Sequence, residues 1–166
     1  MRTPEGRPIG TLKRVIISNI VCSGSVSGLG SVISGIPGHL IEDVKISNVL
    51  VQHQGGAAKE AAAILPPENE QAYPEPTMFG NMPSHGFYIR HAKGIELSGI
   101  EIIPAKEDLR PTFVLDDVAD ADFFRVKTPK VVDIPVFVLR NVTDFSVHMC
   151  KGVQDAQLDR VDSKTL

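Results

Sequence analysis

A short pattern that recurs along the chain constrains the fold more than any other feature. Three segments alternate apolar and other residues, are interrupted by Ser-Asn or Ser-Gly, and then alternate again: Val15–Cys22, Val44–Val51 and Ile95–Ile102. A period of two is typical of a β-strand. Repetition of one such unit indicates a fold in which similar layers stack on each other.

Each segment is predicted to be two short strands joined by a tight bend. Asn19, Asn48 and Gly99 stand at the interruption, and Asn and Gly tolerate the left-handed backbone angles that a sharp bend requires. An Asn side chain can also bond to the same amide one layer above. We therefore expect Asn19 and Asn48 to begin a buried ladder of amides, which Gly99 interrupts.

Weaker copies of the pattern continue toward the C-terminus at Ala121–Val126 and Thr143–Val147. Another short strand precedes each later copy; these strands are Ser31–Ser34, Gly86–Arg90, Pro111–Leu115 and Pro135–Leu139. Three strands per unit and a repeat of this length fit the rungs of a solenoid, in which neighbours bury a continuous core.

Equivalent positions in successive units set the spacing of the repeat. Ile46, Leu97, Phe123 and Val147 are separated by 51, 26 and 24 residues. The sequence therefore predicts an all-β, right-handed parallel β-helix of about five rungs, with residues 1–166 as one domain. A sandwich of hairpins is disfavoured, since no Asn-Gly or Asp-Gly turn is present. An α/β fold is disfavoured because only Gly56–Leu65 could form an amphipathic helix.

The longest interval contains an insertion. Residues 55–85 are rich in Gly and Pro, and a loop of this length in a compact domain is usually functional or mobile. We expect Met78 and Phe79 to fold back as a lid over their own rung. Residues 155–166 are polar and are expected to cap the last rung or to form a frayed tail.

The composition restricts the classes of partner that the chain could bind. The chain carries a net charge of −3 with both signs mixed along it, so no basic stripe indicates nucleic acid. Its apolar runs are far shorter than the roughly 18 residues of a membrane span. Tryptophan is absent and Phe and Tyr are few, so Val and Ile are expected to build the core. Cys22 and Cys150 are expected to be buried free thiols.

The histidines do not form a recognisable metal motif. His39 is expected to be a turn residue, and His53, His85 and His148 do not belong to a His and Cys cluster with the spacing of a metal site. We therefore predict neither a metal nor another cofactor.

Four stretches carry a family resemblance: Gly10–Ile20, Ile36–Val49, Tyr73–His91 and Arg110–Val118. They resemble the C-terminal rungs of bacterial glycoside hydrolase family 28, the polygalacturonase and rhamnogalacturonase group, and Tyr73–His91 is the most specific. The resemblance extends to about residue 150. It implies a pectin lyase-like β-helix, a pectic polysaccharide or oligogalacturonide as ligand, and an extracellular or periplasmic location, although no signal peptide begins this chain.

The same resemblance implies that the catalytic acids are missing. Inverting glycosidases need one carboxylic acid for the leaving oxygen and another carboxylate to activate water. The family supplies them from Asn-Thr-Asp and Asp-Asp segments near Gly-His-Gly and Arg-Ile-Lys, and none of these is matched here. The chain is therefore expected to begin after the active site, to contain no catalytic residue and to be inactive alone.

Asp116 and Asp117 form an acidic pair beside a predicted strand. They could form an acid–base couple. However, Asp at a strand-to-turn corner commonly caps backbone amides, and the surrounding residues do not match the family's catalytic pair. A structural role is favoured.

Substrate-binding candidates lie where the most specific stretch ends. Alternation places Phe87 and Ile89 in the core and Tyr88 and Arg90 on the opposite, solvent-facing side, with His91 next. An aromatic ring suits a sugar face, and Arg suits a carboxylate. The alternative is an Arg that pairs with a nearby acid on an ordinary surface.

On the inserted loop, Tyr73 and Glu75 are weaker candidates for substrate binding. Three functions remain open. The chain is the scaffold segment of a pectin-type glycosidase, a free-standing carbohydrate-binding β-helix, or an oligomerising structural protein. Residues 1–10 contain too few apolar side chains to shield Val15, Ile17 and Ile20, so we expect self-association through the N-terminal rung.

Overall fold

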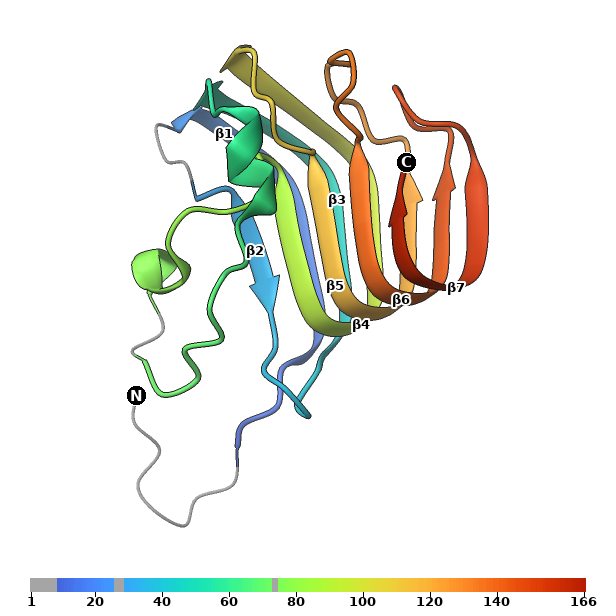
Figure 1. Ribbon diagram of the computed structural model, residues 1–166. Helices are drawn as coiled ribbons and strands as arrows, with labels where there is room; N and C mark the ends of the chain where they lie inside the picture. Colours follow the sequence, from blue (N-terminus) through green and yellow to red (C-terminus); the bar gives the residue numbers. More distant parts are fainter. Residues whose placement is uncertain (1–8, 26–28, 73–74) are drawn as a thin grey trace.

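The computed structural model describes residues 9–25, 29–72 and 75–166 (Figure 1). Its strands are β1 (Lys13–Ser25), β2 (Ser31–Ser34), β3 (Ile41–Gly55), β4 (Phe87–Lys106), β5 (Phe113–Phe124), β6 (Phe137–His148) and β7 (Ala156–Thr165). Two short 3₁₀ helices, η1 (Lys59–Ala63) and η2 (Pro76–Phe79), lie between β3 and β4. No α-helix occurs in these described ranges, so the all-β prediction is confirmed.

All seven strands belong to one mostly parallel sheet. The strands β1, β3, β4, β5 and β6 lie side by side in sequence order and pair in parallel. The short β2 pairs with the beginning of β4, and β7 is antiparallel to β6. Figure 1 shows the long strands as stacked, curved bands. We call each parallel strand, together with the segment that leads into it, a layer.

The predicted register is confirmed at every repeat that the sequence indicated. Ile46 pairs with Leu97, Leu97 with Phe123, and Phe123 with Val147. Ile17 of β1 pairs with Ile46 and extends this column by one layer. Because an alternating strand must keep its apolar side chains on one face, the apolar pattern excludes a slip by one residue. The bends at Asn19, Asn48 and Gly99 lie at equivalent positions and align the layers further.

The long strands bend where a residue adopts a left-handed backbone conformation. The predicted bends at Asn19, Asn48 and Gly99 are confirmed, with φ of 58°, 54° and 61°, although the strands continue through them. Positive φ values recur at equivalent places in the layers: Arg14, Asp43, Gly94, Asp120 and Asp144 form one column; Asn19, Asn48, Gly99, Arg125 and Met149 form a second; His91, Asp117 and Asn141 form a third. These bends fold each layer around the interior.

The amide ladder is present but lies on the outside. Asn48 Nδ2 donates a hydrogen bond to Asn19 Oδ1 at 2.7 Å, and both side chains are exposed. The expectation of a buried ladder is therefore wrong. Ile46 and Val49 take the interior positions on either side of the bend, so Asn48 is left on the outer side of the corner.

The interior face carries one continuous apolar cluster. Val44, Ile46 and Val49 build it in β3, as the composition indicated. From β4 onward, five phenylalanines fill the interior: Phe87, Phe113, Phe123, Phe137 and Phe145, each at most 5% exposed. Their ring centroids lie 4.8–6.0 Å apart in stacked, tilted and edge-to-face pairs. Val and Ile also continue through these layers, for example at Ile95, Ile100 and Val142, so the expected core of Val and Ile is confirmed, and the phenylalanines add to it.

The two ends of the sheet differ. Residues 155–166 are not a frayed tail, because β7 pairs along β6 and packs Leu158, Val161 and Leu166 against the core. At the other end, β3 is the one partner of β1 among the described strands. Its interior side chains Ile17 and Ile20 are 37% and 40% exposed. Residues 1–8 make up most of the stretch that is expected to shield β1 poorly, and they lie outside the described part of the chain.

Only one of the two thiols fits the expected burial. Both cysteines are free, but Cys22 is exposed and Cys150 is half-buried. The burial expected for Cys22 is wrong because Cys22 lies on the edge strand β1.

In the described ranges, no helix has the length and apolar character needed to cross a lipid bilayer.

Candidate functional site

The inserted segment between β3 and β4 lies over the outer face of the sheet near β2 (Figure 1). Tyr88 and Val114 are buried beneath it together with its own Met82, and Phe79 packs against them. The predicted lid role of Phe79 is confirmed. Met78 contributes its backbone carbonyl, which accepts a hydrogen bond from Asn69 Nδ2 at 2.6 Å. This segment therefore closes a second, smaller apolar cluster outside the main core.

The inserted segment covers the two principal sugar-binding candidates, which were expected to be exposed. Tyr88 and Arg90 point away from the main core, as the alternation predicted, but they are only 2% and 3% exposed. They do not line an open groove. The prediction was wrong because strand alternation identifies the face and does not reveal a loop that packs on that face.

The guanidinium of Arg90 holds the inserted segment to the sheet. It donates hydrogen bonds to the carbonyl oxygens of Pro66 at 2.9 Å and Pro67 at 2.7 Å, and to Ser34 Oγ on β2 at 2.9 Å. The ring of Phe79 lies over it, with 5.0 Å between the guanidinium carbon and the ring centroid. A rigid, weakly hydrated guanidinium suits such a buried position.

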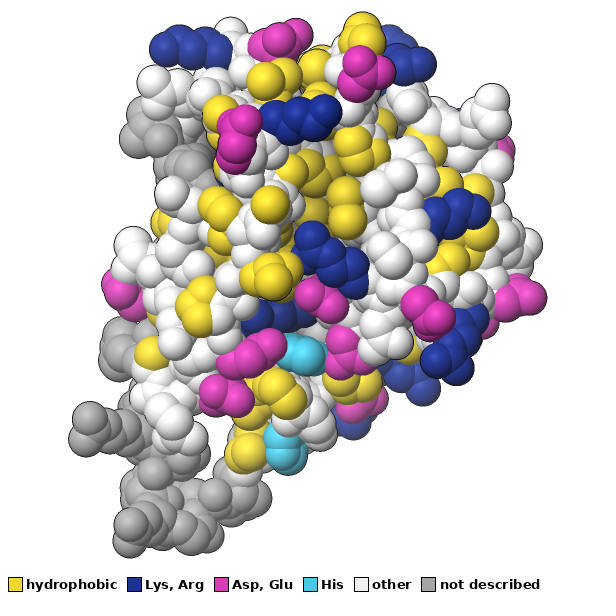
Figure 2. All heavy atoms as spheres, viewed as in Figure 1, with side chains coloured by type: hydrophobic (Ala, Val, Ile, Leu, Met, Phe, Trp, Pro, Cys, Tyr) yellow, Lys and Arg dark blue, Asp and Glu magenta, His cyan; other side chains and the backbone are white. Residues whose placement is uncertain are grey.

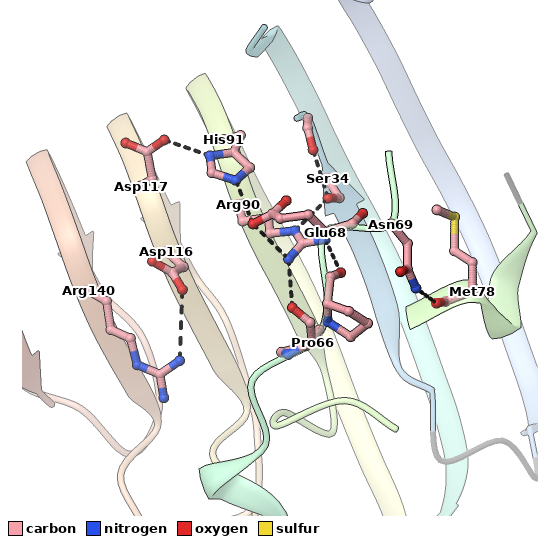
Figure 3. Close-up of polar contacts among 12 residues, drawn as sticks. Ser34, Pro66, Glu68, Asn69, Met78, Arg90, His91, Asp116, Asp117 and Arg140 are labelled. Atoms are coloured by element: carbon pink, nitrogen blue, oxygen red, sulfur yellow. Dashed lines mark hydrogen bonds and ion pairs between the residues drawn. The ribbon is translucent and has the colours of Figure 1, made fainter. Parts of the chain in front are cut away.

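Next to Arg90, His91 joins three parts of the molecule (Figure 3). Its Nδ1 lies 2.7 Å from Asp117 Oδ2 on β5, and its Nε2 lies 3.1 Å from Glu68 Oε1 on the inserted segment. Asn141 of β6 donates to Asp117 Oδ1 at 3.2 Å. Burial lowers the pKa of His91, but the hydrogen bonds with Asp117 and Glu68 outweigh burial and hold that pKa above its ordinary value.

The structure places Asp116 and Asp117 inside β5 and not at the end of a strand. Asp117 occupies a left-handed bend with φ of 57°, and its carboxylate binds the side chains of His91 and Asn141. Asp116 lies 3.9 Å from Arg140 Nη1 (Figure 3). The two carboxylates thus interact with side chains of neighbouring layers, and the expected capping of backbone amides is replaced by these contacts.

Of the two loop candidates, Glu75 belongs to the described residues and does not contact Arg90. Tyr73 lies outside the described residues. Glu75 is exposed and accepts a hydrogen bond from the Thr77 hydroxyl. With Glu68 and Glu70, Glu75 lines a hollow of about 650 Å³, whose walls also include residues of β1, β2 and β3. Of the predicted residues, the structure therefore brings together Tyr88, Arg90 and His91, and it adds Glu68, which sequence reasoning missed.

A buried polar chain was also missed. His53 Nε2 lies 3.2 Å from His85 Nδ1, His85 Nε2 lies 3.0 Å from Thr112 Oγ1, and Thr112 Oγ1 lies 3.0 Å from Thr128 Oγ1. The Gly55 amide donates to His53 Nδ1 at 3.1 Å. His53 Nδ1 is therefore an acceptor, so its Nε2 carries the proton and donates to His85. His85 must in turn donate from Nε2 to Thr112.

This chain requires both imidazoles to be neutral. Burial is the largest influence on both groups; it lowers the pKa of His53 and lowers the pKa of His85 to about 4. Close by, Arg110 and Asp108 form a buried ion pair with two bonds of 2.9 Å. Arg110 also donates to the Met82 carbonyl at 3.1 Å and so fixes the end of the inserted segment.

The outer surface of the layers carries mixed charge. In Figure 2, acidic, basic and apolar side chains alternate over the visible face. Several opposite charges pair between neighbouring layers, for example Lys13 with Glu42 at 2.8 Å and Lys45 with Glu96 at 2.6 Å. Such exposed pairs each contribute little to stability. They do fit the parallel register, because each pair joins partners on adjacent strands.

Neither the arrangement of possible metal ligands nor comparison with known proteins assigns a role to the site. In the described part of the chain, no group of three or more His, Cys, Asp or Glu side chains is arranged to hold a metal ion. No protein-family model matches the sequence, and no curated protein or solved structure shows significant similarity to it.

Proposed function

We propose that the layers form a right-handed parallel β-helix. Five parallel strands pair in sequence order, and bend residues recur at equivalent positions. Equivalent interior residues from Leu97 onward are only 24–26 residues apart, which is enough for one circuit of short strands. The right hand follows from the general rule that about 98% of parallel crossover connections have that hand.

We further propose that this β-helix is the scaffold part of a pectin-acting glycoside hydrolase of the extracellular or periplasmic space. The substrate class comes from the sequence resemblance, above all from Tyr73–His91. Inverting hydrolysis needs one protonated and one ionised carboxyl group facing the same bond. Asp116 pairs with Arg140, and Asp117 binds His91 and Asn141. Both carboxylates therefore already bind side chains of neighbouring layers.

The observation that carries this proposal is the β1 end, where the described residues leave interior side chains exposed. In one interior column, Leu97 is 0% exposed and Ile46 is 6% exposed, whereas Ile17 of β1 is 37% exposed. A stacked-layer protein needs a cover where its last layer shows apolar side chains. In a complete glycosidase, further layers that carry the catalytic acids would provide that cover.

Polygalacturonate tests this proposal in two ways. The purified chain should release no reducing sugar from the polymer, but it should be retarded in a gel that contains polygalacturonate, with a neutral dextran gel as control. Release that disappears in the Asp116→Asn, Asp117→Asn double variant would show that the chain is a complete enzyme. Equal mobility in both gels would contradict a role on acidic polysaccharides.

The same end supports a second candidate, a self-associating β-helix. Ile16 and Val21 on the outer side of β1 are 76% and 71% exposed, in addition to the interior side chains of this strand. An edge strand with free backbone groups and apolar side chains is a ready surface for another chain. Two copies meeting about a two-fold axis form the simplest closed assembly. The mass of the protein in solution tests this candidate directly.

A further inference from the structure

We propose that Arg90 and His91 form a carboxylate-binding site, which Glu68 of the inserted segment fills in this structure. When the Glu68 side chain swings outward, the site takes the carboxylate of an acidic sugar such as galacturonate. The assignment of the ligand as a sugar rests on the proposed function. The assignment of a carboxylate rests on the geometry of the three side chains.

Two donors converge on one oxygen (Figure 3). Glu68 Oε1 lies 3.3 Å from Arg90 Nη1 and 3.1 Å from His91 Nε2. Bonds between a carboxylate and cationic donors are stronger than neutral hydrogen bonds. Arg90 cannot follow Glu68 outward, because the carbonyls of Pro66 and Pro67 hold its guanidinium.

His91 is fixed in the same way from the opposite side. Asp117 holds its Nδ1, and Asn141 holds Asp117. To donate to both Asp117 and Glu68, the imidazole must carry both protons. The charged groups that contact His91 are thus Glu68 and Asp117, with Arg90 beside it. Once Glu68 moves away, two positive charges face the single negative charge of Asp117.

Glu68 is the displaceable member of the cluster. Its side chain is 38% exposed, whereas those of Arg90 and His91 are 3% and 14% exposed. Its second oxygen, Oε2, is buried without a hydrogen-bond partner in the described structure, so this carboxylate is only half satisfied. Rotation of this one side chain would open the site without moving the clamp around Arg90.

The surroundings set the expected strength of binding. Glu70 and Glu75 line the same hollow as Glu68, and Asp116 lies close to Arg140 in the neighbouring layer. Repulsion from these carboxylates should keep the affinity for a monosaccharide weak. Binding should weaken further as the pH rises through the pKa of His91, because the imidazole then loses the proton that it donates to the ligand.

The test is a titration of the His91 imidazole NMR signals with galacturonate. We compare the wild-type chain with Glu68→Ala, which empties the site, and with Glu70→Ala, which removes a nearby charge that contacts neither Arg90 nor His91. Glu68→Ala should bind galacturonate at least about tenfold more tightly than wild type, whereas Glu70→Ala, which removes only part of the surrounding repulsion, should gain no more than about twofold. Glu68→Gln, which keeps the side-chain volume, provides a second variant if Glu68→Ala is poorly folded.

Titrations with two further ligands distinguish an acidic sugar from a neutral sugar and from a simple carboxylate. Galactose, which lacks the carboxylate, should cause no shift. Acetate should cause a weaker shift than galacturonate, and equal affinity for the two would overturn the assignment to a sugar. Absence of a galacturonate shift in both Glu68 variants would overturn the site itself. If polygalacturonate still retarded the wild-type chain in a gel, the proposed function would survive that failure.

Discussion

The two ends of the sheet finish the same repeat in opposite ways. At the C-terminal end, β7 runs antiparallel to β6 and presents Leu158 and Val161 to the core, while Asp159 and Arg160 face solvent. At the other end, β1 is parallel to its only neighbour and shows apolar side chains on both faces. A repeat can continue indefinitely, so a chain needs a different strand to stop it. Among the described residues, such a strand is present at the β7 end alone.

Removal of the cap should have the largest effect. A chain that ends at Asp155 lacks Leu158, Val161 and Leu166 and uncovers Phe145, which is now fully buried. Burying one aliphatic side chain stabilises a protein by about 1.5–3 kcal/mol. We expect a loss of about 5 kcal/mol or more, measured by urea unfolding. Lys164→Ala, an exposed change within β7, is the control, and an unaltered unfolding curve of the shortened chain would refute the capping role.

Two side-chain truncations in the same interior column test the difference between the two ends directly. Leu97→Ala should cost about 3–4 kcal/mol, because it leaves a cavity in a closed layer. Ile17→Ala should cost only about 1 kcal/mol, since Ile17 already contacts solvent. The measurement is chemical denaturation of both variants. Equal losses would mean that β1 is covered as well as β4.

Acid should destabilise the fold through His85. Its pKa of about 4 in the folded state lies below the unfolded value near 6.5. Folding therefore favours the neutral imidazole, and this stability is complete above pH 6.5 and is lost as the pH falls toward 4. The pKa difference corresponds to roughly 3 kcal/mol at most.

The measurement is urea unfolding at pH 7 and pH 4.5 for wild type and His85→Gln. We expect the variant to lose less stability on acidification, although it is less stable at pH 7. His53 and His85 line a hollow at the β1 end, together with Ile17 and Ile20, so hydrogen exchange should show β3 loosening before β6. His91 acts in the opposite sense, because its raised pKa gives stability that is lost as the pH rises. Identical pH dependence in the two proteins would disprove the role of His85.

The smallest effect concerns the exposed amide ladder at the β1 end. Asn48→Gly removes the amide but keeps a residue that accepts a positive φ, so stability should change by less than about 0.5 kcal/mol. Asn48→Ala should cost about 1–2 kcal/mol, because Ala is strained in that conformation. Thermal unfolding distinguishes the two causes. A large loss in the Gly variant would show that the hydrogen bond to Asn19 is important after all.

The sequence predicted the register well because the repeat records it. Ile46, Leu97, Phe123 and Val147 were identified as equivalent and are paired in the structure. Two of the three columns of bends were not predicted, although the sequence contains a signal for the column that includes Asp43. Asp43, Asp120 and Asp144 each precede the second bend of their layer by five residues, and Asp and Asn tolerate the left-handed conformation.

The candidate site was predicted only in part. Alternation correctly directed Tyr88 and Arg90 away from the core, but it contains no information about a loop that packs on the outer face. Glu68 could not be found, because the inserted segment has no periodicity that fixes which side chains point inward. The contact between His53 and His85 also depends on how residues 55–85 leave and rejoin the layers, which no local pattern specifies.

Light scattering tests the central claim, that the β1 end is a surface which binds another layer. We predict that the wild-type chain at micromolar concentration has a mass that rises with concentration toward twice 18.0 kDa. The Ile17→Lys variant should stay at 18.0 kDa, because a charge on the uncovered layer opposes burial, whereas Lys164→Ala on the capped end should behave like wild type. A wild-type mass of 18.0 kDa at every concentration would contradict the claim.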